Sequence, residues 1–205
     1  GSMPYRLPAG GHKLPVLGKQ KRYRGDFMTI FHLHTPLCQE DVKKLNAGDL
    51  VFLKGKVFTA RDKAHALIRR QGSPVPLEGA ALYHCGPIIQ DDSVISAGPT
   101  TSGRMARYTD EILALGVKAI IGKGGLPGEP FLNRAVYLAY PGGCGAAAAS
   151  QLRIRAVHFP ELGMAESIWE LEAEDLGPMV VAVDSYGRDL YQDVRLSAKA
   201  AREKQ

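Results

Sequence analysis

Hydrophobic and polar residues alternate along the chain in short runs that predict an α/β domain. Alternation rich in β-forming residues over 26–36 and 51–57 predicts two β-strands. Apolar residues recur at helical spacing over 102–115, which predicts an amphipathic helix that Gly116 ends. The apolar run 117–121 predicts a strand after this helix.

Strands and short helices continue to alternate through the rest of the chain. Buried strands are expected at "GAALYHCGPII" and "SVISAG", and a turn at 184–187 is expected before a polar, helical or frayed tail. Leu176-Gly177-Pro178 is expected to join two separate strands. The remaining predictions are strands at "AVYLAYP", "IRAVHF", "SIWELEAE" and "MVVAVD", and a short helix at "GCGAAAASQL".

The order strand, helix, strand over 93–121 predicts a βαβ unit with two parallel strands. Loops at the carboxyl ends of parallel strands share one edge of the sheet, where ligands bind. The segments 98–101 and 122–125 are these loops, so Arg104 and Lys123 are expected to face one crevice. The fold class predicted is α/β, with a mixed sheet that contains a parallel βαβ core.

A third cation belongs to the start of another predicted helix. Thr59 and Asp62 have the spacing of a capping box, which predicts a helix from there to about Arg70. Arg61 then lies in the first turn, beside unpaired backbone N–H groups and the positive end of the helix dipole. A cation is unfavourable there unless an anion sits between it and the helix. At the 102–115 helix, one of two adjacent threonines is expected to cap, which leaves the other free to face the crevice.

The net charge of +5 is concentrated near the amino terminus. Six Lys or Arg stand between Pro4 and Asp26 against one acid, and the remaining residues carry 20 of each sign. We interpret 1–3 as an expression scar, 4–27 as a basic flexible arm, 28–194 as one domain and 195–205 as a polar tail. The arm indicates a partner-docking extension, with nucleic-acid binding as an alternative.

The number and spacing of the cysteines bear on the cellular compartment and on possible metal sites. Cys38, Cys85 and Cys144 are odd in number and widely separated, so neither a disulfide framework nor a zinc site is predicted. A reducing, cytoplasmic compartment fits best, and no secretory signal or membrane-spanning apolar run is recognised. Three cysteines could in principle ligate an iron–sulfur cluster.

Each candidate residue also has a simpler interpretation. Lys123 stands between glycines but lacks the Walker pattern, so "GKGG" fits a tight turn with a solvated lysine as well as an anion or mononucleotide site. Arg104 alone would fit a surface ion pair. His65, four residues after Arg61, fits a structural histidine better than a catalytic one. No motif for covalent catalysis is present.

Four stretches together carry a resemblance to a known family. "KVFTARDKAH", "GPTTSGRM", "IIGKGG" and "ELGMAESIW" resemble the β subunit, or carboxyl-terminal domain, of iron–sulfur class I fumarate hydratases and L-tartrate dehydratases, over roughly Thr29 to Tyr191. The resemblance implies a swivelling β/β/α domain that closes over a separate α subunit in an α2β2 assembly. That subunit would hold the [4Fe–4S] cluster with its own cysteines, leaving no metal site on this chain.

The resemblance also implies roles for the four motif residues. Arg61, Arg104 and Lys123 would bind a four-carbon dicarboxylate, either fumarate/malate or L-tartrate/oxaloacetate, and Thr100 would be the base. A threonine hydroxyl is intrinsically a poor base, so a carboxylate of the α subunit is the alternative. "GMAESIW" and "GGCG" favour tartrate. A standalone anion- or nucleotide-binding module without catalysis is the competing function.

Overall fold

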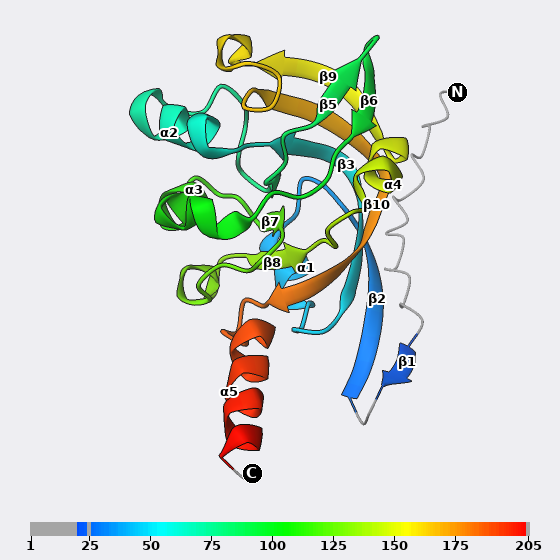
Figure 1. The fold of residues 1–205 in the computed structure, drawn as a ribbon, viewed down its shortest axis with the longest axis vertical. Coiled ribbons are helices and arrows are strands. Elements are labelled where there is room, and N and C mark those ends of the chain that lie inside the picture. Colours follow the sequence, from blue (N-terminus) through cyan, green and yellow to red (C-terminus); the bar gives the residue numbers. More distant parts are fainter. Residues whose placement is uncertain (1–19, 24–25, 204–205) are drawn as a thin grey trace, which may run out of the picture.

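The computed structural model describes residues 20–23 and 26–203 (Figure 1). An eight-stranded sheet has the order β1-β2-β3-β4-β7-β8-β10-β9 and is closed by an additional β3–β10 pairing. Its strands are β1 (Gln20–Tyr23), β2 (Asp26–His34), β3 (Leu50–Thr59), β4 (Ala81–Tyr83), β7 (Ala119–Gly122), β8 (Val136–Ala139), β9 (Leu152–His158) and β10 (Ile168–Val183).

The helices are short except at the carboxyl terminus. They are α1 (Gln39–Lys43), α2 (Asp62–Gln71), α3 (Thr109–Ala114), α4 (Gly145–Ser150) and α5 (Leu190–Arg202), with 3-10 helices η1 (Ser102–Tyr108), η2 (Glu129–Phe131) and η3 (Pro160–Leu162). Helices α2 and α3 lie on one side of the sheet, and α5 projects away from the body (Figure 1). None of the described helices is long and apolar enough to cross a membrane.

Parallel pairing runs through the centre of the sheet. Strands β2–β3, β3–β4, β4–β7 and β7–β8 are parallel, whereas β10 is antiparallel to β3, β8 and β9. The prediction of an α/β fold with a mixed sheet is therefore confirmed.

Alternate residues of the central strands supply two hydrophobic cores. Phe58, Leu82 and Ile120 pack with residues of α2, η1 and α3. Val57 and Ile121 face the other side, where α1 and α4 contribute buried residues. Side chains of successive strand residues point to opposite faces, so both faces of these strands are covered. The central strands are continuous apolar runs in the sequence because both of their faces are buried.

The predicted βαβ unit is wrong in one of its strands. "SVISAG" forms β6 (Ser93–Ser96), which pairs with β5 (Ile88–Gln90) in a separate two-stranded sheet. This hairpin is half-exposed rather than buried. The strand parallel to β7 is instead β4. The hairpin is thus an insertion in the crossover between β4 and β7, which a linear pattern of apolar runs does not distinguish from a central strand.

The two strands predicted on either side of Leu176-Gly177-Pro178 form one continuous strand. Residues 168–183 form one strand, β10, which shifts register around Leu176. Leu176 is fully buried and pairs with Leu53, so burial keeps this stretch in the sheet despite Gly177-Pro178. The turn predicted at 184–187 is confirmed, since the Gly187 backbone N–H donates to the Asp184 carbonyl at 3.3 Å.

The predicted helix 102–115 is divided into η1 and α3. Met105, Tyr108 and Ile112 are buried as expected, but Leu115 is exposed. Gly116 has a φ of +95° and ends the helix, as predicted.

The structure shows a regular element at each end of the described chain, within the predicted arm and the predicted tail. Most of the expected arm, 4–27, lies outside the described residues, but 20–23 form β1, antiparallel to β2. This part of the predicted arm thus pairs with the domain. At the other end α5 includes most of the predicted tail, and the Asp189 carboxylate caps it by accepting from the Tyr191 and Gln192 backbone N–H groups.

Candidate functional site

The four predicted site residues lie at one edge of the sheet. Arg61 follows β3, and Lys123 follows β7 directly. The Thr100 backbone N–H donates to the His84 carbonyl just after β4 at 2.7 Å, and the Lys123 N–H donates to the Thr100 carbonyl at 3.3 Å. The Ser102 N–H in turn donates to the Lys123 carbonyl at 2.8 Å. The Thr100 segment thus inserts between the carboxyl ends of β4 and β7.

A buried hydroxyl network lies directly under these loops. Ser102 is fully buried, and its Oγ lies 2.8 Å from His84 Nδ1 and accepts from the Tyr137 hydroxyl at 3.0 Å. A side chain at Gly122 would collide with Ser102 Oγ, so only glycine lets the loop approach β7 this closely. The network therefore fixes the segment that carries Thr100 against the strand that precedes Lys123.

Two of the three cations are paired with carboxylates. Arg61 Nη2 lies 3.3 Å from Glu166 Oε1, and Arg104 Nη2 donates to Asp62 Oδ2 at 2.6 Å. The Arg61 and Glu166 side chains are 22% and 16% exposed, whereas Arg104 is 51% exposed. Since Asp62 is the residue after Arg61, both pairs converge on the start of α2.

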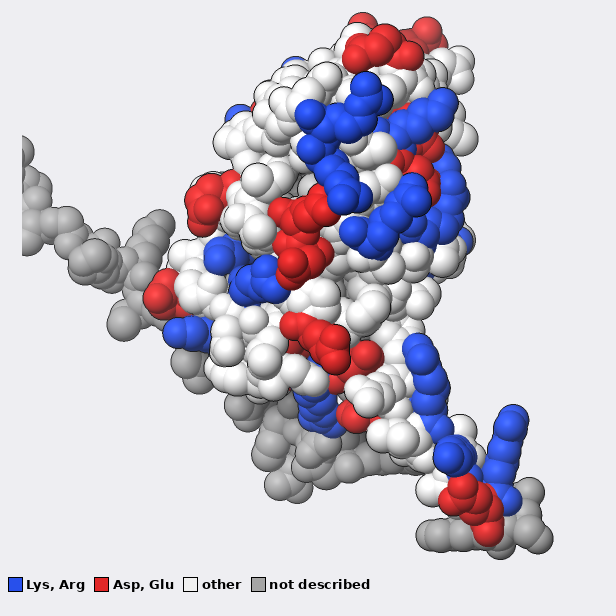
Figure 2. Space-filling model, turned by 90° about the vertical axis from the view of Figure 1, so that its left-hand side faces the viewer, with Lys and Arg blue, Asp and Glu red and all other residues white. Residues whose placement is uncertain are grey.

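Lys123 differs from the two arginines. Its side chain is exposed, and within 20–23 and 26–203 no carboxylate pairs with it. It lies near the loop before α4, since a Cβ at Gly142 would be 4.0 Å from Lys123 Cδ. Burial raises the pKa of the Cys144 thiol in this loop, and the charge of Lys123 opposes that effect. Figure 2 shows basic side chains gathered in the upper part of the face it presents, with acidic ones among them. Of the three cations, Lys123 alone holds no carboxylate of the described chain.

The predicted helix caps are both wrong. Thr59 lies at the end of β3, where its Oγ1 accepts from the Trp169 backbone N–H at 2.9 Å, so it is used in the sheet. The cap of α2 comes from a distant segment, since Glu166 Oε2 accepts from the Lys63 backbone N–H at 2.9 Å. Thr101 stands at the start of η1 without a capping side-chain bond.

Two histidines form an apolar layer behind the site. His65 is 1% exposed, stacks on Tyr108 and contacts His84 edge to face at a centroid distance of 5.1 Å. Burial lowers the pKa of His65 to about 4 and holds the pKa of His84 well below its usual range. Both rings are therefore neutral at pH 7. This burial fits the structural interpretation of His65, although neither of its ring nitrogens has a hydrogen-bond partner in the described chain.

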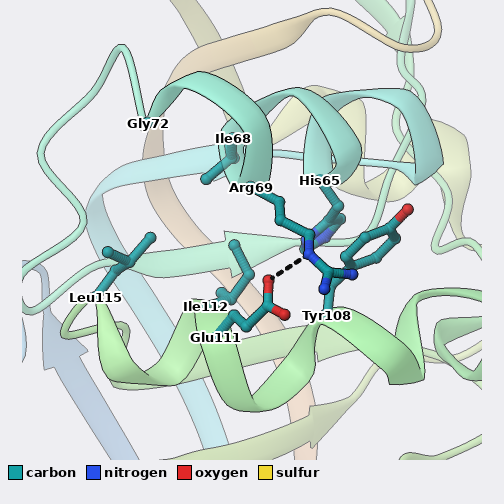
Figure 3. Close-up of a pocket in the computed structure, with 8 residues that line it drawn as sticks. All are labelled: His65, Ile68, Arg69, Gly72, Tyr108, Glu111, Ile112 and Leu115. Atoms are coloured by element: carbon teal, nitrogen blue, oxygen red, sulfur yellow. Dashed lines mark ion pairs between the residues drawn. The ribbon is translucent and has the colours of Figure 1, made fainter.

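A cavity of about 290 Å³ lies between α2 and α3, and His65 forms part of its lining. In Figure 3 the His65 and Tyr108 rings lie side by side, and the Arg69–Glu111 ion pair spans the two helices in front of them. The walls are otherwise largely apolar. The cavity brings together none of the four predicted site residues.

The described residues provide no ligand set for a metal. No group of three His, Cys, Asp or Glu side chains in this part of the chain is placed to hold an ion. Cys38 is exposed, Cys85 is buried and Cys144 is intermediate, and all three are free thiols. The three cysteines are therefore not part of such a group in this part of the chain.

Asp62 and Glu166 were missed as members of the site. Asp62 was assigned to a cap, and Glu166 was quoted only as part of "ELGMAESIW". An acid next to Arg61 in the sequence was a usable signal. The contact of Glu166 with Arg61 spans more than a hundred residues and carries no local pattern.

These features define an α/β domain in which the loops that carry Arg61, Thr100 and Lys123 gather at the carboxyl ends of parallel strands. The family model described as Fumarase C-terminus matches residues 9–194, and the chain belongs to this family.

Curated relatives agree with this assignment. The putative L(+)-tartrate dehydratase subunit beta of Methanocaldococcus jannaschii is 44% identical, over 77% of this chain and 89% of that protein. The L(+)-tartrate dehydratase subunit beta of Escherichia coli is 36% identical, over 77% of this chain and 85% of that protein. A putative class I fumarate hydratase of Geobacillus stearothermophilus is 34% identical over 82% of this chain, which covers 35% of that longer protein.

Proposed function

We propose that this chain is the β subunit of a hydro-lyase that removes water from, or adds water to, a four-carbon dicarboxylate. The observation that supports this most directly is the insertion of the Thr100 segment between His84 and Lys123, which sets a threonine beside a lysine at the sheet edge. Arg61 and Arg104 lie at the same edge. Two relatives named L(+)-tartrate dehydratase subunit beta are matched by this chain over 89% and 85% of their own length.

The three cations suit a short dianion. Each arginine has five N–H donors in a planar fork, so a guanidinium that already holds one carboxylate can still bind a second. Lys123, which has no acidic partner among the described residues, supplies the third positive charge. Elimination of water from a hydroxy acid builds negative charge on the carboxylate next to the carbon that loses its proton. A fixed cation beside that carboxylate lowers the barrier more than it stabilises the substrate, whereas a cation on the other carboxylate contributes to binding.

Proton removal is the step that this chain alone explains least. Thr100 is half-buried, and its backbone is held on both sides, which supports a role for this residue at the edge. A hydroxyl is a weak base, and Lys123 as its neighbour would lower its pKa. We assign Thr100 to proton transfer, with a carboxylate of the partner subunit as the final acceptor.

The partner completes the site. We propose an α subunit, in an α2β2 assembly within a reducing cytoplasmic compartment, that carries the [4Fe–4S] cluster. Bound there, the cluster would act as a Lewis acid toward the leaving hydroxyl. On this chain Arg61, Arg104 and Lys123 would bind and orient the diacid, and Thr100 would take part in proton transfer.

L-Tartrate is the substrate that we favour, because the two subunits named above are called tartrate dehydratase subunits beta and are matched over most of their length. Co-expression with a cysteine-bearing partner should give a brown, oxygen-sensitive complex that converts L-tartrate to oxaloacetate. Fumarate and malate are the comparison substrates. A cluster-loaded complex that is inactive on all three would overturn the proposal, and tartrate binding by the isolated chain alone would favour a binding module.

A further inference from the structure

The segment "ELGMAESIW" has no role in the function proposed above, although its Glu166 is in contact with the site. One carboxylate oxygen of Glu166 lies 3.3 Å from Arg61 Nη2, and the other accepts from the Lys63 backbone N–H at 2.9 Å. The second bond ties the carboxylate to the first turn of α2. Because both oxygens are engaged, Glu166 offers Arg61 a carboxylate of fixed orientation.

The loop that carries Glu166 is itself well held. The Glu166 and Ser167 backbone N–H groups both donate to the Gly163 carbonyl at 2.9 Å, which closes a tight turn. Ser167 Oγ donates to the Gly163 carbonyl at 2.9 Å, and Trp169 Nε1 donates to the Met164 carbonyl at 2.8 Å. Four short bonds within this loop leave Glu166 little freedom to follow Arg61 if the arginine moved.

Gly86 holds the other side of the Arg61 side chain. A Cβ at Gly86 would lie 2.6 Å from Arg61 Nη1 and 2.6 Å from the Ala165 carbonyl oxygen. Arg61 therefore runs through a slot between the backbone after β4 and the Glu166 loop. Its Nε is buried and has no hydrogen-bond partner within the described residues. An arginine has many rotamers, and this slot restricts them before any anion arrives.

We propose that Glu166 is a positioning residue, which orients the Arg61 guanidinium toward the sheet edge so that it can bind one carboxylate of the substrate. The substrate part of this inference rests on the proposed function, whereas the orientation of Arg61 does not. Glu166 acts through Arg61 and makes no contact with the substrate. Replacing it should weaken substrate binding without removing the groups that carry out the reaction.

The orientation can be tested on the full chain by NMR with ¹⁵N-labelled arginine. The Hε signal of Arg61, identified by its loss in Arg61→Lys, should exchange slowly with solvent because Nε is buried. Glu166→Gln should speed this exchange at least about tenfold, the scale of losing one charge-assisted contact. Glu161→Gln, an exposed acid in the same connection, is the matched control and should leave it unchanged. Equal exchange in Glu166→Gln and the unmodified chain would overturn the positioning role.

A kinetic cycle on the loaded complex tests its consequence. Glu166→Gln should raise the KM for L-tartrate about tenfold and leave kcat within about twofold, because a binding contact is lost. In an Arg61→Ala background the same change should have no further effect on KM. An equal loss in both backgrounds would show that Glu166 acts by capping α2 and would refute the proposal.

The outcomes separate the two proposals. An inactive unmodified complex contradicts the hydro-lyase function while the exchange measurement still decides the orientation of Arg61. An active complex that tolerates Glu166→Gln contradicts the role of Glu166 alone. If Glu166→Gln does not fold, Glu166→Asp serves instead, because the shorter side chain keeps the negative charge but cannot reach both Arg61 Nη2 and the Lys63 backbone N–H.

Discussion

The guanidinium of Arg104 donates to the carboxylate of Asp62 at 2.6 Å, which ties the first turn of η1 to the first residue of α2. Arg61, the residue before Asp62, pairs with Glu166. Two arginines separated by more than forty residues are thus drawn to the start of one helix. Of the three predicted site cations, Lys123 is then the one with no such partner in the described chain.

Replacing Arg104 by Ala should reduce kcat/KM by about a hundredfold or more while the free energy of unfolding changes by less than about 1 kcal/mol. The stability cost is small because exposed ion pairs contribute little, whereas a cation that stabilises developing charge contributes several kcal/mol. Arg134→Ala breaks a comparable exposed pair with Asp110 and is the control for both measurements. Turnover by Arg104→Ala at the unmodified rate would remove Arg104 from the site.

Lys123→Ala should lower kcat of the loaded complex by about a hundredfold or more, with the melting temperature unchanged. Because Lys123 is exposed, its removal takes a positive charge from the site and leaves the packing of the hydrophobic core unchanged. Lys54→Ala, an exposed lysine on β3, should leave kcat unchanged. A loss confined to KM would assign Lys123 to ground-state binding alone.

The sequence predicted the strands at the centre of the sheet because they are apolar on both faces. It failed where two elements of similar pattern have different partners. "SVISAG" and "GAALYHCGPII" both contain β-forming residues, yet Ala81–Tyr83 is buried in the main sheet while Ser93–Ser96 is half-exposed in a hairpin. Pairing is decided by tertiary packing, which a local pattern does not contain.

The candidate site shows the same division. The positions of Arg61, Arg104 and Lys123 follow from element boundaries, which periodicity can predict. The cap of α2 was wrongly assigned to Thr59, since the carboxylate that accepts from the Lys63 N–H belongs to Glu166, in the connection between β9 and β10. Contacts of this kind depend on the order of strands in the sheet and cannot be predicted from spacing.

Ser102→Ala should lower the free energy of unfolding by about 1–3 kcal/mol, because the Tyr137 hydroxyl and His84 Nδ1 both lose a buried partner. The Thr100 loop should loosen with it, so kcat should fall as well. Ser150→Ala removes an exposed hydroxyl that donates to the Ala147 carbonyl and should change neither quantity. Urea unfolding of the isolated chain measures the first effect. An unchanged midpoint would show that the network does not fix the loop.

Acidification should destabilise the chain through its buried histidines. The pKa of His65 is about 4 in the folded chain against an ordinary value of 6.5, so the unfolded chain binds more protons between these two values. Stability from this group is present above pH 6.5 and is lost as the pH falls toward 4. At pH 5 the loss from His65 is about 2 kcal/mol. His84, also with a lowered pKa, adds to it in the same direction.

Two variants separate this effect from general acid denaturation. His65→Phe keeps a planar ring against Tyr108 and should flatten the dependence of the unfolding free energy on pH between 7 and 5. His32→Gln changes an exposed histidine that pairs with Asp175 and should leave most of the slope in place. Because carboxylates titrate mainly below pH 5, a slope in this window reports on histidines. An equal slope in His65→Phe and the unmodified chain would show that His65 is not the group responsible.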